Sequence, residues 1–503
     1  MTKDRMWKRK LFSICTNSLL ILLFGASQPG AEQATSVTQR GVTFYFQDNE
    51  TVGTFVNGDY WVLAPVTITS ITPAYSNGQN GWEVNPVGMT SGYDPTGQGF
   101  YSGSASWNSA RVPSLPYTAS TTQSIVKTIY SPITDSHSYN SYIATAVVLT
   151  VVTEVPANNG ATVFRPPWIG TSKPLYNVED VRLDRLPNTY ALQSGAPTLA
   201  TVAKQFTPVW LDFHSRSLRS KDAMYDYGPQ NTPVTNNAML RLMLNDRLTD
   251  PKWNEAFYKF TQYAIDTAHA VYNGFRKSTG HSPGYPVIAG WAATLLEGHG
   301  DMSAIKTYLA NVTNFTDFSY TGESVSVLDG KSLWGQTNTE KAYWNYIRGL
   351  GGNRSNKDPY GYIDGGNDPG GGYANVNSQA YKGEVLIAKL MPAIRNAINS
   401  SRYASLENYV ERWVDIGAWA LPDPCAPYTA GGTYRVDYGP NGSGGCITGS
   451  GRFPTRHGSN RDGGQYKSAF VAGMWNAYKG TSPPPPSSPS SPQNLRIIQK
   501  IGE

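Results

Sequence analysis

Two blocks of the chain combine glycine with aromatic and polar side chains of the kinds that bind and cleave sugars. One runs from Asp358 to Tyr373 and the other from Gly451 to Tyr466, and a helical pattern follows each of them. Tyrosine and histidine can transfer protons, and arginine can hold a carboxylate through two hydrogen bonds. We therefore expect the blocks to line an extended polar groove, with candidate side chains at Tyr360, Tyr362, Asp364, Tyr373, Arg456, His457 and Arg461.

The second block is unusually basic for this chain. Three arginines and one histidine fall within ten residues, at Arg452, Arg456, His457 and Arg461. A positive cluster that faces a groove would stabilise the carboxylates of uronic acids. The alternative interpretation is an ordinary solvated loop.

A third candidate is the histidine block KSTGHSPGYPVIAGW. His281 and Tyr285 stand four residues apart where a helical pattern begins. One helical turn of separation would let both side chains face the same cleft. A buried or capping histidine explains the same pattern.

Two more segments carry candidate substrate-binding residues. In TNNAMLRLML, Thr235 or Asn236 is expected to cap a helix, and Asn237 can bind a substrate carboxylate. In WGQTNTEKAYWNYIRGLGG, Trp344 and Arg348 fall on one predicted helix. Such a mixture is found in sugar clefts and also on ordinary amphipathic helices.

Two cleavage chemistries compete for these residues. β-Elimination of a uronate polymer needs a group that neutralises the C5 carboxylate, a base for the C5 proton and an acid for the leaving oxygen. Hydrolysis needs two carboxylic side chains across the scissile bond. Carboxylates are present at Asp358, Asp364, Glu384 and Asp423, but no pair stands out by spacing. The residues favour elimination; a glycoside hydrolase on an α/α scaffold and a non-catalytic carbohydrate-binding or scaffold protein are the alternatives.

The N-terminal segment, residues 1–31, has the layout of a secretory signal peptide. Basic residues precede an apolar run from Leu11 to Phe24, and small residues follow as far as Ala31. The apolar run is shorter than the roughly 20 residues of a spanning helix, so cleavage is favoured over an uncleaved anchor. We expect a secreted protein, extracellular or periplasmic, without stable membrane anchoring.

The net charge limits the classes of molecule that the protein is expected to bind. The leader holds five of the 41 basic residues and one of the 36 acidic residues, so the remaining chain is nearly neutral. That argues against nucleic acid but permits an acidic polysaccharide bound in a locally basic cleft.

Cys425 and Cys446 are expected to form a disulfide, with two free thiols as the alternative.

No cofactor is expected from the sequence. The histidines show no metal-ligand spacing. Calcium could bind near Asp364 and Asp368, but these two fall short of the about six to eight oxygen ligands that Ca²⁺ prefers.

The candidate residues are positioned by elements whose sequence pattern changes along the chain, from strand-like to helix-like. Residues 37–160 alternate in the manner of strands and predict an N-terminal antiparallel β-sandwich, within which Tyr60 and Trp61 belong to the core. Residues 161–198 read as an irregular linker. Residues 199–479 carry helical stripes separated by long polar loops, which predicts an incomplete α/α-toroid; an irregular helical bundle would give a similar pattern. The expected fold class is multidomain α+β.

The clearest stripe lies in Trp253 to Phe275, where apolar residues recur at helical spacing: Ala256, Phe257, Phe260, Ala264, Ala268 and Val271. Near the C-terminus, residues 480–492 form a Pro/Ser linker. Residues 493–503 resemble the opening strand of a fibronectin type III module, which is expected to be truncated.

Several of these blocks together resemble a known group of proteins. STGHSPGYPVIAGW, DPYGYIDGGNDPGGGY, PDPCAPY and GRFPTRHGSNRDGGQYKSAFVAGMWNAY resemble large secreted bacterial proteins related to α/α-toroid polysaccharide lyases that act on alginate or glucuronan. The likeness extends from about Gly41 to Lys479. Toroid lyases use Asn, His, Tyr and Arg in the cleft, so the resemblance implies catalytic roles for Asn237, His281, Tyr285 and Arg456 or His457.

Overall fold

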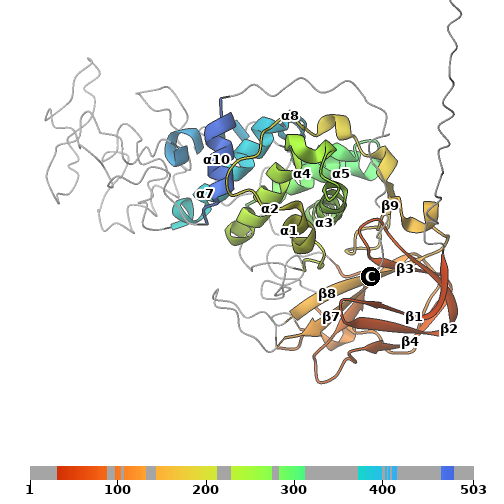
Figure 1. The fold of residues 1–503 in the computed structure, drawn as a ribbon. Helices are drawn as coiled ribbons and strands as arrows, with labels where there is room; N and C mark the ends of the chain where they lie inside the picture. The colour runs from red at the N-terminus through yellow and green to blue at the C-terminus, as the bar shows by residue number, and fades with distance from the viewer. Residues whose placement is uncertain are drawn as a thin grey trace, which may run out of the picture.

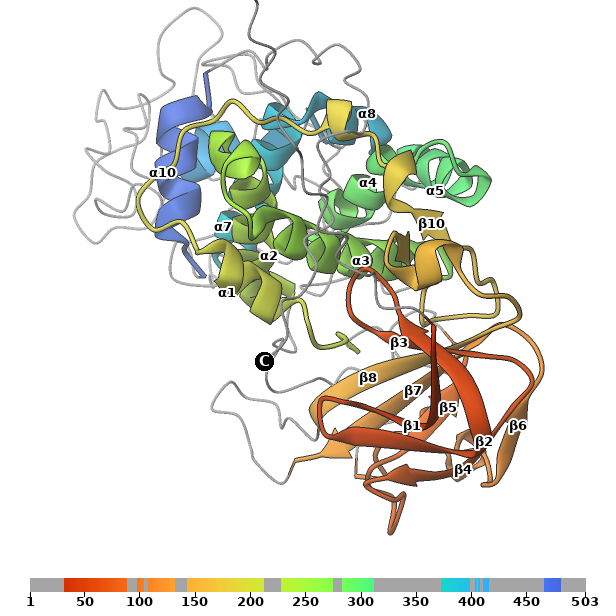
Figure 2. The same cartoon turned by 45° about the vertical axis from the view of Figure 1, so that its right-hand side comes forward.

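The computed structural model describes two parts of the chain, a curled β-sheet followed by a helical region. The described residues are 31–87, 97–103, 107–131, 143–211, 228–274, 283–311, 372–398, 403–404, 406–407, 410–415 and 466–480. Figure 1 shows the helices gathered on one side of the sheet, and Figure 2 shows the same arrangement from a second direction. The predicted mixed α+β class, strands first and helices after, is confirmed.

The β region consists of one hydrogen-bonded path of strands. In order across the sheet they are β5 (Trp82–Val84), β7 (Gln123–Tyr130), β8 (Ile143–Val152), β3 (Tyr60–Leu63), β2 (Val42–Thr54), β4 (Val66–Thr72) and β6 (Tyr117–Ala119), with β1 (Glu32–Gln39) also paired to β2. Pairing is antiparallel except between β3 and β8, which run parallel. A small second sheet joins β9 (Val163–Phe164) to β10 (Tyr176–Asn177).

The sheet curls until its two ends meet. Trp82 on β5 contacts Tyr117 on β6 edge to face, with ring centroids 5.6 Å apart. The two strands stand at opposite ends of the path, so this contact closes the curl. An apolar core that includes Val42, Phe44 and Ile68 fills the interior.

Strands β7 and β8 are buried on both faces, which explains their long apolar runs. Ile125, Val147 and Leu149 point into the curl, whereas Val126 and Val148 join the core shared with the helices. Side chains alternate between the two faces of a strand, so each strand serves two cores. The helical region therefore packs on the face of β7 and β8 that points away from the interior of the curled sheet.

The helical region contains, among the described residues, α1 (Leu199–Gln205), α2 (Gly228–Leu242), α3 (Trp253–Tyr272), α4 (Tyr285–Leu295), α5 (Gly300–Asn311), α7 (Gly372–Leu390), α8 (Pro392–Ala397), the π-helix η9 (Val410–Asp415) and α10 (Ala469–Tyr478). Helix α3 packs on α1 and α4, and α2 packs on α7 and α10. The stripe predicted for α3 is confirmed, since Phe257, Phe260 and Ala264 are fully buried. No helix within the described ranges has both the length and the apolar character needed to cross a membrane.

The predicted start of α2 was wrong. Thr235 or Asn236 was expected to cap the helix, but α2 begins at Gly228 and contains Pro233. A proline lacks the N–H that would bond to the carbonyl four residues earlier. In α2 the hydroxyl of Thr232 donates to that carbonyl, Pro229 O, at 2.8 Å, which satisfies the acceptor that Pro233 leaves.

A buried charge cluster ties the sheet to the helices, and we call Asp59, Arg165 and Asp266 the Arg165 cluster. Arg165 is 2% exposed; its Nε donates to Asp59 Oδ2 at 2.5 Å, and its two terminal nitrogens donate to the oxygens of Asp266 at 2.8 and 2.6 Å. Although burial opposes its charge, Asp266 and Asp59 raise the pKa of Arg165. Asp59 precedes β3 and Asp266 lies on α3, so one guanidinium joins both regions.

Candidate functional site

The structure describes only a part of the predicted site. Asn237 and Tyr285 lie within it, and Tyr373 lies in the first turn of α7, where side chains are outside the described set. The other predicted residues fall outside the described ranges: His281, Trp344, Arg348, Tyr360, Tyr362, Asp364, Cys425, Cys446, Arg456, His457 and Arg461. The geometry below therefore concerns the helices that begin where the predicted blocks end.

The first connection joins α10 to α2. The hydroxyl of Ser468 donates to Asn237 Oδ1 at 2.6 Å. The same oxygen accepts the N–H of Val471 at 3.2 Å, so Ser468 is the N-cap of α10. The helix that follows the block Gly451 to Tyr466 thus begins against Asn237.

The second connection joins the start of α4 to α7. The N–H of Gly284, the N-cap residue of α4, donates to Glu384 Oε1 at 2.5 Å. Gly284 has a φ of +91°, which a residue with a side chain adopts only under strain. A Cβ at this position would also lie 3.1 Å from Thr232 on α2. The turn that follows the histidine block is therefore held between α2 and α7.

The third connection joins α7 to α2 directly. Asn236 Nδ2 donates to the carbonyl of Ala380 at 3.2 Å. The helices are so close that a Cβ on Gly383 would lie 2.1 Å from Asn236 Nδ2. Asn236 Oδ1 is buried and has no hydrogen-bond partner within the described residues. All three connections therefore reach the segment of α2 between Thr232 and Asn237.

Glu384 is the ionisable group at the centre of this arrangement. It is 4% exposed, and its burial raises the pKa of its carboxyl to about 8 despite the opposing hydrogen bond from Gly284. The carboxyl is therefore mostly protonated at neutral pH, when it can donate a proton or a hydrogen bond. Strong pKa perturbation of this kind is common at functional sites. The sequence named Glu384 only as one of several carboxylates; its position within the apolar run GEVLIAKL was the available signal.

The site is enclosed by buried side chains. Tyr285 is 2% exposed, so its ring packs in the interior in this arrangement and does not face solvent. Lys382 is equally buried, and its Nζ lies 5.6 Å from the centre of the Trp475 ring, within the range of a cation–π interaction. Asn237 is only half-buried, which makes it the accessible one of the two predicted residues.

A second group of titratable residues, absent from the sequence-based set, lies between β10, α3 and α5. The hydroxyl of Tyr176 is 2.7 Å from His269 Nε2 and also donates to Asp301. Burial acts to raise the pKa of Asp301, but hydrogen bonds from His269 and Tyr176 lower it overall. Because Tyr176 is fully buried, this group is suited to holding α5 on α3.

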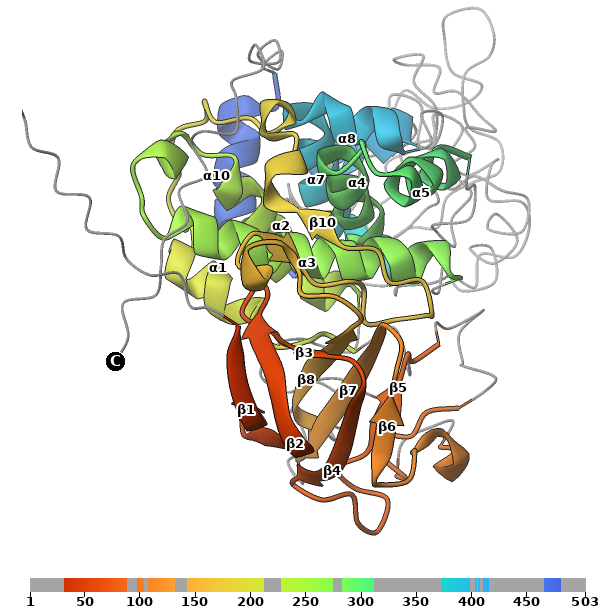
Figure 3. The ribbon, with the colours of Figure 1, turned by 90° about the vertical axis from the view of Figure 1, so that its right-hand side faces the viewer.

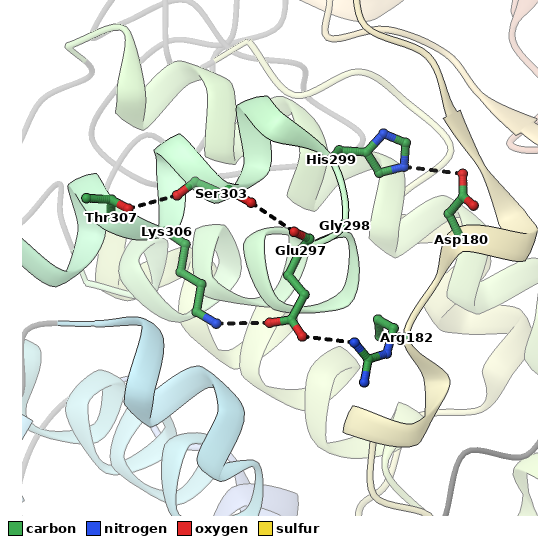
Figure 4. A pocket seen from close by; sticks show the side chains of 8 residues that line it. All are labelled: Asp180, Arg182, Glu297, Gly298, His299, Ser303, Lys306 and Thr307. Atoms are coloured by element: carbon green, nitrogen blue, oxygen red, sulfur yellow. Dashed lines mark hydrogen bonds and ion pairs between the residues drawn. The ribbon is translucent and has the colours of Figure 1, made fainter.

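A surface depression of about 660 Å³ is lined by Arg182, Glu297, His299 and Lys306, among others (Figure 4). It lies next to that group, because the ring of His299 is 4.9 Å from the ring of Tyr176. Its charges neutralise one another: Glu297 accepts from Arg182 at 3.1 Å, from Arg185 at 2.7 Å and from Lys306 at 2.9 Å. His299 Nε2 is 3.4 Å from Asp180 Oδ2. With each cation already on a carboxylate, the depression offers little to an acidic ligand.

The described residues contain no group of three or more His, Cys, Asp or Glu side chains able to hold a metal ion. Asp364 and Asp368, the residues considered for calcium, lie outside the described ranges. Comparison of the chain with models of known families, with curated proteins and with solved structures finds no match.

Proposed function

We propose that this protein is a secreted lyase that cleaves a uronic-acid-containing polysaccharide by β-elimination. The observation that carries the proposal is that the start of α10 and the middle of α7 are hydrogen-bonded to α2. The start of α4 is hydrogen-bonded to α7 and lies next to Thr232 of α2. In the sequence these points adjoin the blocks with His281, with Tyr360 to Tyr373, and with Arg456 and His457. The resemblance to toroid lyases supports the same residues.

The reaction assigns a separate task to each group. Arg456 and the Nδ2 donors of Asn237 hold the C5 carboxylate, which lowers the cost of the negative charge that develops there. His281 takes the C5 proton, the C5–H electrons form the C4–C5 double bond, and the C4–O bond breaks. A tyrosine hydroxyl of the first block, such as Tyr360 or Tyr362, protonates the leaving oxygen. Ser468 already donates to Asn237 Oδ1, which turns the amide so that Nδ2 remains for the substrate.

We extend the proposal to the architecture of the helical region and of the β region. For the helical region we propose an incomplete α/α-toroid, and the packing of α3 on α4 and of α2 on α7 supports it. For the β region we propose a β-sandwich, and the apolar core enclosed by the curled sheet supports it. Strand β1 starts at Glu32, immediately after the predicted cleavage region, which suits a leader removed on export.

Hydrolysis is the second candidate, and Glu384 is the observation in its favour. A carboxyl with a pKa of about 8 keeps at neutral pH the proton that a general acid must donate. An inverting or retaining hydrolase also needs a second carboxylate across the bond. The candidates Asp358, Asp364 and Asp423 lie outside the described residues.

The test is a screen of alginate, glucuronan, pectate and hyaluronan with two readouts. Elimination creates an unsaturated uronate that absorbs ultraviolet light together with a new reducing end; hydrolysis creates the reducing end alone. We expect both signals from at least one polymer. Reducing ends without absorbance would establish the hydrolase, and neither signal would overturn both cleavage proposals.

His281→Ala is the decisive variant, and His299→Ala is its matched control. We expect His281→Ala to abolish formation of the unsaturated product while the circular dichroism spectrum is unchanged. His299 pairs with Asp180 beside the neutral depression, so its loss should leave the rate as in the wild type. An unchanged rate in His281→Ala would remove this histidine from the reaction.

A further inference from the structure

Two aromatic rings stand together at the surface of the β region, far from the proposed cleavage site. Tyr75, in the connection between β4 and β5, is 39% exposed, and Trp107 is partly exposed. Their ring centroids are 6.4 Å apart and their planes are tilted by 32°, so the two rings form one small aromatic cluster at the surface. We propose that Tyr75 and Trp107 form a platform that binds a pyranose ring of a polysaccharide chain without cleaving it.

The connection from β4 to β5, which carries Tyr75, lies at the end of the sheet away from the helices (Figure 3). Thr72, the last residue of β4, pairs with Thr43 at the start of β2. The other end of β2 leads towards Asp59, which is bonded to Arg165 beside α3. The connection that carries Tyr75 therefore starts at the far end of the β region, so a chain bound here is held by a surface separate from α2, α4 and α7.

The two segments that carry the rings are fixed to each other. The carbonyl of Gly78 accepts the N–H of Ser102 at 2.8 Å, and the N–H of Gly81 donates to Phe100 O at 3.0 Å. The backbones are so close that a Cβ on Gly81 would lie 1.9 Å from the carbonyl oxygen of Gly99. Such a frame holds the rings in place before a ligand arrives, which lowers the entropy cost of binding.

A buried glutamine fixes the Trp107 side of the frame. Gln98 is fully buried; its Nε2 donates to Tyr101 O at 2.7 Å, and its Oε1 accepts the N–H of Phe100 at 2.7 Å. Its backbone bridges to Trp107, and its carbonyl accepts the N–H of Asn108 at 2.9 Å. The ring of Trp107 therefore emerges from an ordered backbone.

The side chains near the two rings indicate which class of ligand binds there. Residues 73–81, 97–103 and 107–110 contain no charged side chain, and exposed Ser76, Asn77 and Ser102 supply hydroxyl and amide groups. Two cations contact these segments, but Lys127 is buried and donates to Asn80 O, and Arg111 is paired with Glu83. An aromatic face beside small polar side chains suits a sugar, which has a C–H face and a rim of hydroxyls.

Other ligand classes fit less well. Stacking of nucleic-acid bases relies on a positively charged groove, and these segments have no lysine or arginine. A stable protein interface covers about 800 Å² on each partner with an apolar centre, whereas here the apolar area is two rings among polar residues.

The choice of polymer rests on the proposed function, but binding at the platform does not depend on catalysis. The two are separated by measuring retardation in native gels that contain alginate, glucuronan, pectate or hyaluronan, next to the formation of unsaturated product. Retardation without product would overturn the lyase and keep the platform. Product without any loss of retardation in the variants below would overturn the platform and keep the lyase.

The variants are Tyr75→Ala, Trp107→Ala and the double change, with Tyr45→Ala as the matched control because Tyr45 is a 41% exposed tyrosine on β2 of the same region. Loss of one stacking ring should weaken retardation by about tenfold, and Trp107→Phe should restore part of it. Because no charges take part, added salt should leave this contribution unchanged. Equal losses in Tyr45→Ala and Trp107→Ala, or a double variant that binds like the wild type, would overturn the assignment.

Discussion

The Arg165 cluster and the surroundings of Glu384 are both buried between elements far apart in sequence, but their polar groups are satisfied to different degrees. Arg165 makes three charge-assisted hydrogen bonds to two carboxylates. Glu384 receives one hydrogen bond within the described part of the chain, from the N–H of Gly284.

This difference in hydrogen bonding indicates different roles for Arg165 and Glu384. A buried charge with complete pairing fixes the relative position of the elements that carry it, here the β region and α3. A buried acid with a raised pKa is destabilised in its charged form, and perturbed groups of this kind cluster at functional sites. The comparison therefore separates an architectural cluster from a candidate site without reference to any homologue.

The largest effect is expected from Arg165→Met. This change leaves Asp59 and Asp266 buried without their cation, which should reduce the free energy of unfolding by about 3–5 kcal/mol. The measurement is urea-induced unfolding at neutral pH, followed by circular dichroism.

Arg182→Met is the control for that experiment. Arg182 also pairs with two carboxylates, Asp184 and Glu297, but its side chain is 42% exposed. Exposed pairs contribute about 0–1 kcal/mol, so the control should lose little. Comparable losses in the two variants would contradict the architectural role of the Arg165 cluster.

The second expected effect is a pH dependence that comes from Glu384. Its pKa is about 8 in the folded protein and 4.5 ordinarily, so between these values the folded state keeps a proton that the unfolded chain releases. The folded state binds more protons, so stability must fall as pH rises through this window, by at most about 1.4 kcal/mol per pH unit, and level off above pH 8.

Glu384→Gln removes this dependence because an amide has no proton to lose, while its oxygen can still accept the N–H of Gly284. Urea unfolding of both proteins from pH 5 to pH 8 should show the wild type losing stability relative to the variant. Glu255→Gln is the control, since Glu255 is 56% exposed and pairs with Lys259 one turn away. Parallel curves for wild type and Glu384→Gln would mean that Glu384 ionises normally.

The sequence predicted those features that depend on local periodicity. The spacing of Phe257, Phe260 and Ala264 predicted the buried face of α3, and Trp61 was correctly expected in the core of the β region. Such patterns repeat within one element, so a short window of sequence contains the information.

Features that depend on long-range contacts could not be read in this way. Arg165 is hydrogen-bonded to Asp59 and Asp266, which lie 106 and 101 residues away in the sequence. Gly284 is hydrogen-bonded to Glu384, which lies 100 residues away. The start of α2 was misplaced because Thr235 or Asn236 was taken as its cap, and only the structure reveals that the helix continues through Pro233, where the Thr232 hydroxyl bonds to the carbonyl of Pro229. The roles assigned to His281, Arg456 and His457 stay predictions.

The smallest expected effect concerns the link between α10 and Asn237. Ser468→Ala removes the N-cap of α10 and should cost about 1 kcal/mol. Thr198→Ala is the matched control, because Thr198 caps α1 by accepting the N–H of Thr201 at 3.0 Å and lies on a helix outside the site. Both variants should lose similar stability in urea, whereas turnover of the responsive polymer should fall only in Ser468→Ala, where Asn237 loses the donor that orients its amide. Equal turnover in the two variants would show that Ser468 only caps its helix, and that Asn237 needs no support from α10.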